Sequence, residues 1–170
     1  MADDTVDIGR RELLRGRTRA LPPAIRPPWS RLDRFTSLCT RCGACADACP
    51  EGILRAGDGG FPEVDFRLGE CSFCGACADA CPAPVFDRAA ARPWDLMATI
   101  GAACLSARGV VCRSCQDACQ HSAIRFTPSP GGVAHARVET HSCTGCGACV
   151  SICPVGAITM RTETGEGHAV

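Results

Sequence analysis

Residues 39–50 read Cys39-Thr-Arg-Cys42-Gly-Ala-Cys45-Ala-Asp-Ala-Cys49-Pro50, and this run decides how the chain is organised. Three cysteines at C-x2-C-x2-C spacing put three thiolates on one short loop, within reach of adjacent iron atoms of a single cluster. Cys49 follows Cys45 by four residues, which is about one helical turn. In bacterial C-x2-C-x2-C-x3-C-P runs the last cysteine ligates the neighbouring cluster. Such a motif is therefore expected in pairs.

The motif occurs four times. Residues 75–82 repeat residues 43–50 letter for letter, and the fourth copy keeps the strict spacing, with Pro154 after its last cysteine. The third copy is looser, because seven residues separate Cys104 from Cys112. Together the copies use every cysteine of the chain: Cys39, Cys42, Cys45, Cys49, Cys71, Cys74, Cys77, Cys81, Cys104, Cys112, Cys115, Cys119, Cys143, Cys146, Cys149 and Cys153. Complete use of this kind argues against chance.

Iron-sulfur clusters explain these cysteines better than two other structures. A secreted disulfide framework is disfavoured, because the cysteines gather in fours and no signal peptide is recognisable. Zinc needs only two C-x2-C pairs per ion and leaves the third C-x2 step unexplained. With two Trp, six Phe and no Tyr in 170 residues, the apolar core is small, so metal centres are expected to organise it. We expect four 4Fe-4S clusters, which add about −8 to the formal net charge of zero.

Two stretches between the motifs are typical of β-hairpins. Residues 52–56 and 61–66 flank Gly57-Asp-Gly-Gly60, and residues 123–127 and 133–140 flank Pro128-Ser-Pro-Gly-Gly132. Each half thus repeats the order cluster loop, short helix, hairpin, cluster loop. The expected fold class is α+β: two tandem bacterial-type two-cluster ferredoxin-like domains with short helices and β-hairpins, whose cores are organised by iron-sulfur clusters.

The expected divisions are a basic, proline-containing arm at residues 1–34, a first domain at residues 35–92, a second domain at residues 93–160 and a polar, frayed tail at residues 161–170. Residues 8–16 are compatible with a short helix, and the prolines after them favour an extended path up to Trp29. The arm is either a solvated tail or a segment that docks on a partner.

Residues 86–105 join the halves. Sections 94–97 and 100–103 are compatible with helix, interrupted by Pro93. We expect either a connector that covers cluster faces with Trp94, Leu96 and Met97, or a plain core helix.

Glycine recurs beside the cysteines, at positions 43, 75, 145 and 147. Glycine permits positive φ where the backbone passes close to sulfide, and leaves N–H groups free to donate to sulfur. We interpret the third copy as having Gln116 in place of the glycine and Gln120 in place of the proline, with His121 next. This departure marks either one cluster of distinct potential or distinct lability, or simple drift in a loop. His121 is not expected to be a ligand, because four thiolates are available.

Two ligand pairings stay open. In the nested scheme the first motif pairs with the fourth and the second with the third. The sequential scheme, which the hairpin inside each half favours, gives four sets, numbered by the motif that supplies three of their cysteines. They are Cys39, Cys42, Cys45 and Cys81 (first set); Cys71, Cys74, Cys77 and Cys49 (second set); Cys104, Cys112, Cys115 and Cys153 (third set); and Cys143, Cys146, Cys149 and Cys119 (fourth set).

Other functional motifs are missing from the sequence. It contains no phosphate-binding loop, no dinucleotide fingerprint, no nucleophile with its base and no apolar run of membrane-spanning length. We therefore expect no enzyme, no small-molecule substrate, no nucleic-acid partner and no membrane span.

Several segments carry a more specific signal than the cysteine spacing. They are Arg10-Arg11-Glu-Leu-Leu, Arg26-Pro-Pro-Trp29, Cys39-Thr-Arg-Cys42, Cys71-Ser-Phe-Cys74, Trp94-Asp-Leu96, Cys112-Arg-Ser-Cys115-Gln-Asp and Cys143-Thr-Gly-Cys146-Gly-Ala-Cys149. On these segments the chain resembles the NapF ferredoxin-type proteins that accompany periplasmic nitrate reductases. The resemblance runs nearly end to end, and the looser third motif is part of it.

The resemblance implies a cytoplasmic accessory protein with four 4Fe-4S clusters. It also implies contact with the catalytic molybdenum subunit of periplasmic nitrate reductase before export, and a role in maturing that subunit or supplying it with electrons. The alternative is an electron-conducting ferredoxin subunit of a larger oxidoreductase complex. A free arginine-rich arm favours the first function, because a permanent conducting subunit has less need of a detachable docking segment.

Overall fold

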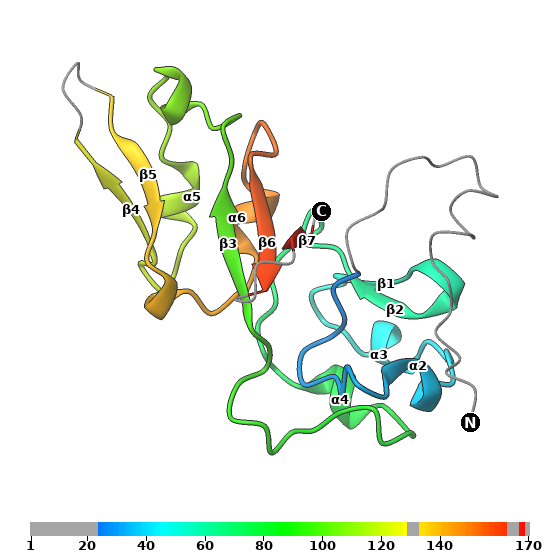
Figure 1. Ribbon diagram of the computed structural model, residues 1–170. Helices are drawn as coiled ribbons and strands as arrows, with labels where there is room; N and C mark the ends of the chain where they lie inside the picture. Colours follow the sequence, from blue (N-terminus) through cyan, green and yellow to red (C-terminus); the bar gives the residue numbers. More distant parts are fainter. Residues whose placement is uncertain (1–23, 129–132, 163–166, 169–170) are drawn as a thin grey trace, which may run out of the picture.

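The computed structural model describes residues 24–128, 133–162 and 167–168. Within them the chain forms two halves that lie side by side, each with short helices and a small β-hairpin (Figure 1). This arrangement agrees with the expected α+β class. None of the helices in the described part of the chain has the length and apolar character needed to cross a bilayer.

The first half is built around one hairpin and three four-residue helices. Its elements are α2 (Phe35–Leu38), α3 (Ala44–Asp47), β1 (Leu54–Ala56), the 3-10 helix η1 (Asp58–Gly60), β2 (Pro62–Val64) and α4 (Ala76–Asp79). Strands β1 and β2 pair antiparallel with Leu54 opposite Val64. Two glycines of the connecting turn, Gly59 and Gly60, have φ of 65° and 79°, a conformation that glycine adopts without steric cost. The predicted hairpin is confirmed.

The second half adds a three-stranded sheet to the same plan. Its elements are β3 (Leu96–Ile100), η2 (Ser106–Arg108), α5 (Ser114–Asp117), β4 (Ile124–Thr127), β5 (His135–Val138), η3 (Thr140–Ser142), α6 (Ala148–Ser151), β6 (Ile158–Thr162) and β7 (Gly167–His168). Strands β4 and β5 form the second predicted hairpin, with Ile124 opposite Val138. The sheet, with strand order β3-β6-β7, is not predicted by the sequence.

Strand β3 corrects the prediction of helix in the segment that joins the halves. Residues 96–100 pair antiparallel with β6, from Leu96 opposite Thr162 to Ile100 opposite Ile158. Buried Leu96 and Ala98 alternate with more exposed neighbours, which is the period of a strand with one covered face. Helical propensity in so short a segment is a weak preference, and pairing with a distant strand overrides it.

The end of the chain differs from the frayed tail predicted from residue 161 onward. Strand β6 continues through Thr162, and β7 pairs with it through Gly167 opposite Arg161. The prediction is therefore wrong for these residues, while residues 163–166 and 169–170 lie outside the described part.

The described part of the arm packs on the first half. Ile25 is buried, and its carbonyl accepts a hydrogen bond of 2.8 Å from Val64 N–H. Trp29 N–H donates to Pro93 O at 2.6 Å, and Arg31 N–H donates to Val85 O at 2.8 Å. Residues 24–31 therefore belong to the folded body, whereas the possible helix at residues 8–16 and the arginines before residue 24 lie outside the described residues.

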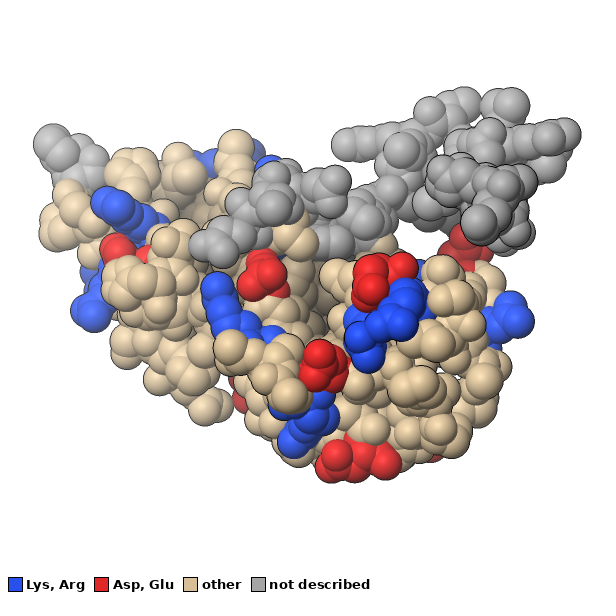
Figure 2. Space-filling view, turned by 60° about the horizontal axis from the view of Figure 1, so that its bottom comes forward, with Lys and Arg blue, Asp and Glu red and all other residues tan. Residues whose placement is uncertain are grey.

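The buried side chains of both halves form one contiguous cluster. Phe66 and Ile53 from the first half and Met160 from the second are its largest fully buried members. Basic and acidic side chains are interspersed on the face shown in Figure 2. The two halves thus share a core, and the domain limits at residues 35–92 and 93–160 stay a prediction.

Candidate metal centres

Each cysteine motif folds as a loop that leads into a short helix. In all four copies the third cysteine lies inside the helix and is buried: Cys45 in α3, Cys77 in α4, Cys115 in α5 and Cys149 in α6. The fourth cysteine follows just after the helix has ended, so its side chain is directed to a different place from the first three.

The expected glycine conformation is present. Gly43, Gly75, Gly145 and Gly147 have φ of 83°, 82°, 76° and 83°. Three of them, at positions 43, 75 and 147, occupy the residue that precedes a helix. Glycine is favoured there because a Cβ atom makes positive φ costly.

The third copy requires a correction. The residue that precedes α5 is Arg113, with φ of −133°, so Arg113 and not Gln116 stands in place of the glycine. Gln116 lies inside the helix, one position after the buried Cys115. The alignment predicted from the sequence is therefore shifted in this copy, and the loop entering α5 follows a different backbone path from the other three.

Beside Trp29, which lies in the arm, three left-handed residues that are not glycine lie in or next to the cysteine motifs and were missed from the sequence. Arg41, Phe73 and Ser122 have φ of 60°, 54° and 51°. Aligning the four motifs would have found them, because Arg41 and Phe73 occupy the position of Gly145, and Ser122 occupies that of Gly156.

In the first half the thiols gather in two groups, and each group mixes cysteines of both motifs. Burial raises the pKa of Cys45, and the charges of Cys81 and Cys39 raise it further. A cavity beside them is lined by cysteines of motifs one and two: Cys49, Cys71, Cys74 and Cys77. Cys49 and Cys81 have therefore exchanged partners, as in the sequential pairing.

The second half repeats this exchange. One cavity is lined by Cys104, Cys112, Cys115 and Cys153. Another is lined by Cys119, Cys143, Cys146 and Cys149, with His121 at its wall. The structure thus groups the thiols sequentially and crossed within each half.

The three cavities are alike in size, and each is lined by the four thiols of one set. Their similarity suits one kind of occupant in each. In the described residues no three Cys, His, Asp or Glu side chains converge closely enough for a single metal ion. Four thiols around one cavity match the four cysteine ligands of a 4Fe-4S cluster.

Backbone N–H groups point at the sulfur atoms. Ala123 N–H donates to Cys119 Sγ and Ala157 N–H donates to Cys153 Sγ, both at 3.3 Å. Phe73 N–H donates to Cys71 Sγ at 3.4 Å. Donors of this kind stabilise thiolates and tune the potential of a bound cluster.

Thr144 supplies a further polar group at the fourth set. Its Oγ1 is buried and has no hydrogen-bond partner of regular geometry. It lies close to the thiol of Cys146: burial, the larger effect, raises the pKa of that thiol, and the Thr144 hydroxyl lowers it. A buried hydroxyl needs an acceptor, and the sulfur atoms of a 4Fe-4S cluster would provide one. The donor set therefore fits the cluster.

Burial has a strong effect on the thiols. It raises the pKa of Cys71 and of Cys149 to about 12, and that of Cys77 and Cys115 to about 11. Without metal these thiols hold their protons at neutral pH, so metal binding must displace them. Exposed Cys42 differs, because the N–H of Ala44 and then the Thr40 hydroxyl lower its pKa.

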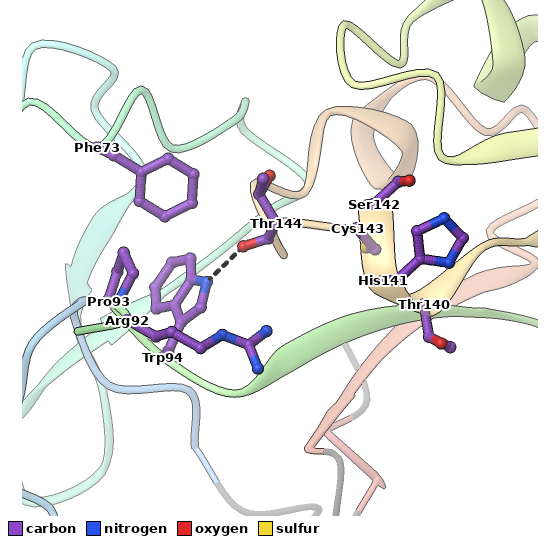
Figure 3. Close-up of a pocket in the computed structure, with 9 residues that line it drawn as sticks. All are labelled: Phe73, Arg92, Pro93, Trp94, Thr140, His141, Ser142, Cys143 and Thr144. Carbon is purple, nitrogen blue, oxygen red and sulfur yellow. Dashed lines mark hydrogen bonds between the residues drawn. The ribbon is translucent and has the colours of Figure 1, made fainter.

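Trp94 lies between the halves, against the loop of the fourth motif. Its indole N–H donates to Thr144 O at 3.1 Å, and its ring meets Phe73 edge to face at 5.6 Å (Figure 3). A pocket of about 450 Å³ opens beside it, with Arg92 and His141 on its walls. Leu96 is buried in β3 as part of the shared core.

Comparisons with known proteins agree with this geometry. The family of 4Fe-4S dicluster domains matches the chain twice, at residues 38–85 and 110–157. Ferredoxin-type protein NapF of Escherichia coli (strain K12) is 49% identical over 157 residues, covering 92% of this chain and 96% of that protein. Ferredoxin-type protein NapF of Haemophilus influenzae is 48% identical over 166 residues, covering 91% and 94%.

A more distant relative belongs to a larger assembly. It is a component of the ion-translocating oxidoreductase complex of Methanosarcina acetivorans, 39% identical over 129 residues, which covers 72% of this chain and 47% of that protein.

Two dicluster domains and 16 cysteines fit four 4Fe-4S clusters. With nearly half of its residues identical to the NapF relatives over almost their whole length, the chain belongs to the family of NapF ferredoxin-type iron-sulfur proteins.

Proposed function

We propose that this protein is a cytoplasmic accessory protein of periplasmic nitrate reductase. It binds the catalytic molybdenum subunit before export and assists its maturation, by electron transfer or by supplying iron-sulfur units. The kinship with NapF proteins supports the link to the nitrate reductase system. The observation that carries the electron-transfer role is the exposure of Cys42 and Cys74, which opens two thiol sets to the surface.

The 16 cysteines are proposed to hold the clusters in the four sets defined above. The clusters supply one-electron chemistry when bound. The protein groups have simpler tasks: the thiolates hold iron, the backbone donors stabilise the thiolate charge, and buried residues such as Cys77 and Cys149 keep water from part of each site.

An apolar rim around the third set suits contact with a partner protein. Val110 and Val111 precede Cys112, and Ile152 and Val155 flank Cys153; their exposed fractions are 50%, 80%, 49% and 41%. Within the described residues, four of the six large apolar side chains that are exposed lie here, and clustering of this kind marks interaction sites. We propose that the catalytic subunit covers this rim.

The test is capture of the catalytic subunit, still carrying its export signal, by the tagged full-length protein from anaerobic cytoplasmic extract. Val111→Ser should weaken capture, because its side chain contributes apolar area to the contact. Leu68→Ser is the control, because it changes an exposed apolar residue outside the rim and should leave capture unchanged. Val64→Ser would not serve, because it would damage the buried core. Equal capture by the unchanged protein and both surface variants would contradict the proposed rim.

Location is tested separately. Residues 1–40 fused to a reporter that is active only after export should give no periplasmic signal, because arginines and prolines interrupt any apolar region in this segment. A strong periplasmic signal would overturn the cytoplasmic assignment.

The alternative is a conducting subunit in a larger oxidoreductase. The similarity to a component of an ion-translocating oxidoreductase complex favours it. A stable, stoichiometric complex on native gels would support this alternative, whereas transient association with the catalytic subunit supports the maturation role.

A further inference from the structure

The two halves touch at cysteines of different thiol sets. Cys71 N–H donates a hydrogen bond to Cys146 O, with an N–O distance of 2.8 Å. Cys71 belongs to the second set and Cys146 to the fourth. From one sulfur to the other, the path runs Sγ–Cβ–Cα–N–H of Cys71 and then O=C–Cα–Cβ–Sγ of Cys146. It consists of covalent bonds and a single hydrogen bond.

We call this contact between the halves, at Cys71 and Cys146, the seam. Aromatic side chains pack beside it and stabilise it. Trp94 packs edge to face on Phe66 of the first half, with ring centroids 5.8 Å apart. Its N–H donates a hydrogen bond to Thr144 O, in the loop of the fourth motif (Figure 3). Gly147, in the same loop, lies so close to Phe66 that an added Cβ would overlap the ring. The loop and the first half are therefore in direct van der Waals contact.

The other two sets lie away from the seam. In the first half helix α3, which carries Cys45 of the first set, packs against α4, which carries Cys77 of the second set. In the second half α5, with Cys115 of the third set, packs against α6, with Cys149 of the fourth set. The first and second sets are therefore neighbours, and so are the third and fourth. Among the described residues, no cysteine of the first or third set takes part in a hydrogen bond across the seam.

We infer that electrons cross between the halves at this seam, between the second and fourth sets. The four clusters then form one path in the order first, second, fourth, third, which differs from their order in the sequence. In the crossing step one cluster loses one electron and is oxidised, and the other gains it and is reduced; no bond breaks and no proton moves. The electron enters from a one-electron donor protein at one end and leaves to a one-electron acceptor at the other.

The distance dependence of electron transfer supports this order. Electron tunnelling weakens exponentially with distance and is stronger through bonds than through space, so the bonded route at Cys71 and Cys146 carries the transfer between halves. The inference rests on the proposed ligand sets, but not on the proposed partner or location.

Two glycines provide a matched pair of variants. Gly147→Ala adds a methyl group that overlaps Phe66, and must push the fourth motif away from the first half. Gly43→Ala is the same change at the same position of the first motif, with the same φ of 83°, but its added methyl meets nothing within 4 Å. Both variants carry the cost of positive φ, and only Gly147→Ala strains the seam. Phe66→Leu in the Gly147→Ala background should relieve the overlap.

The readout is electron paramagnetic resonance of the fully reduced, full-length proteins, with iron counts on the same samples. Magnetic interaction between a reduced cluster of each half should be weakened in Gly147→Ala, retained in Gly43→Ala and partly restored by Phe66→Leu, at equal iron content. Equal interaction in the two glycine variants, at full iron content, would overturn the inference. Iron contents that disagree with four clusters would instead count against the ligand sets.

A second experiment removes clusters and leaves the seam intact. The full-length variant Cys39→Ser, Cys42→Ser, Cys104→Ser, Cys112→Ser keeps the second and fourth sets. Its reference, Cys71→Ser, Cys74→Ser, Cys104→Ser, Cys112→Ser, keeps the first and fourth. The inference predicts magnetic interaction between the two reduced clusters of the first protein and at least a several-fold weaker interaction in the reference. The reverse order would overturn it.

Discussion

Backbone conformation at single positions shapes every loop around the thiols. Ser122 has positive φ at the position that corresponds to Gly156 of the fourth motif. Its N–H donates a hydrogen bond to Cys119 O at 3.0 Å, as the N–H of Gly156 does to Cys153 O. A residue with a Cβ pays a steric cost there that glycine avoids. The turn is kept because the N–H of the next residue, Ala123, reaches Cys119 Sγ.

Ser122→Gly should therefore stabilise the protein by about 0.5–1 kcal/mol, since relief of the left-handed strain exceeds the added freedom of the unfolded chain. Gly156→Ser is the reverse change at the matched position, where an added Cβ meets nothing within 4 Å, and should destabilise by a similar amount. Thermal unfolding of the cluster-loaded proteins under anaerobic conditions measures both. Shifts of the same sign would contradict the argument.

Thiol protonation predicts a pH dependence of cluster uptake. In the cluster-free chain burial raises the pKa of Cys71 to about 12 and that of Cys77 to about 11. Both thiols are protonated below these values, so uptake by the second set releases protons and strengthens as pH rises. Each released proton changes the apparent affinity by about tenfold per pH unit.

The first set should respond less, because hydrogen bonds from Ala44 N–H and Thr40 lower the pKa of Cys42, which opposes the raised pKa of Cys45. Anaerobic titration of iron and sulfide at pH 7, 8 and 9 tests this, with the sets distinguished through Cys42→Ser and Cys74→Ser variants. An equal pH dependence of the two sets would show that burial does not control their uptake.

At the level of elements, each short helix serves two thiol sets. Helix α3 carries Cys45 toward Cys81 and ends just before Cys49, which lies with Cys71 around a separate cavity. Because four residues are about one turn, the two cysteines leave the helix at different levels. The helix therefore couples neighbouring sets mechanically.

Cys49→Ala should remove the cluster of the second set and largely spare that of the first. Cys45→Ala is the matched change one turn earlier and should have the opposite selectivity. Iron counts and resonance spectra of the reduced variants distinguish the two outcomes. If Cys49→Ala eliminated only the first-set cluster, the crossed ligand assignment would be wrong.

At the scale of the whole molecule, the arm divides at about residue 24. Residues 24–31 are fastened to β2 and to the chain near Val85 and Pro93 by hydrogen bonds, and Arg26 lies over the Phe35 ring at 5.1 Å. These contacts assign the second part of the arm to the fold. The docking hypothesis is thereby confined to residues before 24.

Deleting residues 1–20 should leave iron content and unfolding temperature nearly unchanged while reducing capture of the catalytic subunit, and more so at low ionic strength, because exposed charges mainly affect encounter. Deleting residues 1–31 is the control and should lower stability by several kcal/mol, since it exposes the site of buried Ile25 and removes Trp29 from its ring contacts. Unchanged capture after the shorter deletion would establish a solvated tail without a docking role.

The sequence by itself determined what depends on local spacing. Cysteines three and four residues apart, glycines beside them and glycine-bearing turns predicted the cluster type, the positive φ at Gly43 and both hairpins, because turn and helix geometry act over a few residues. Tertiary structure decided the rest. Strand β3 forms because β6, about 60 residues later, pairs with it. Ile25 and Trp29 join the fold because the first half provides a surface for them. Cys71 contacts Cys146 because Trp94 and Phe66 pack between the halves. These contacts join residues far apart in the chain, and local sequence carries no signal for them.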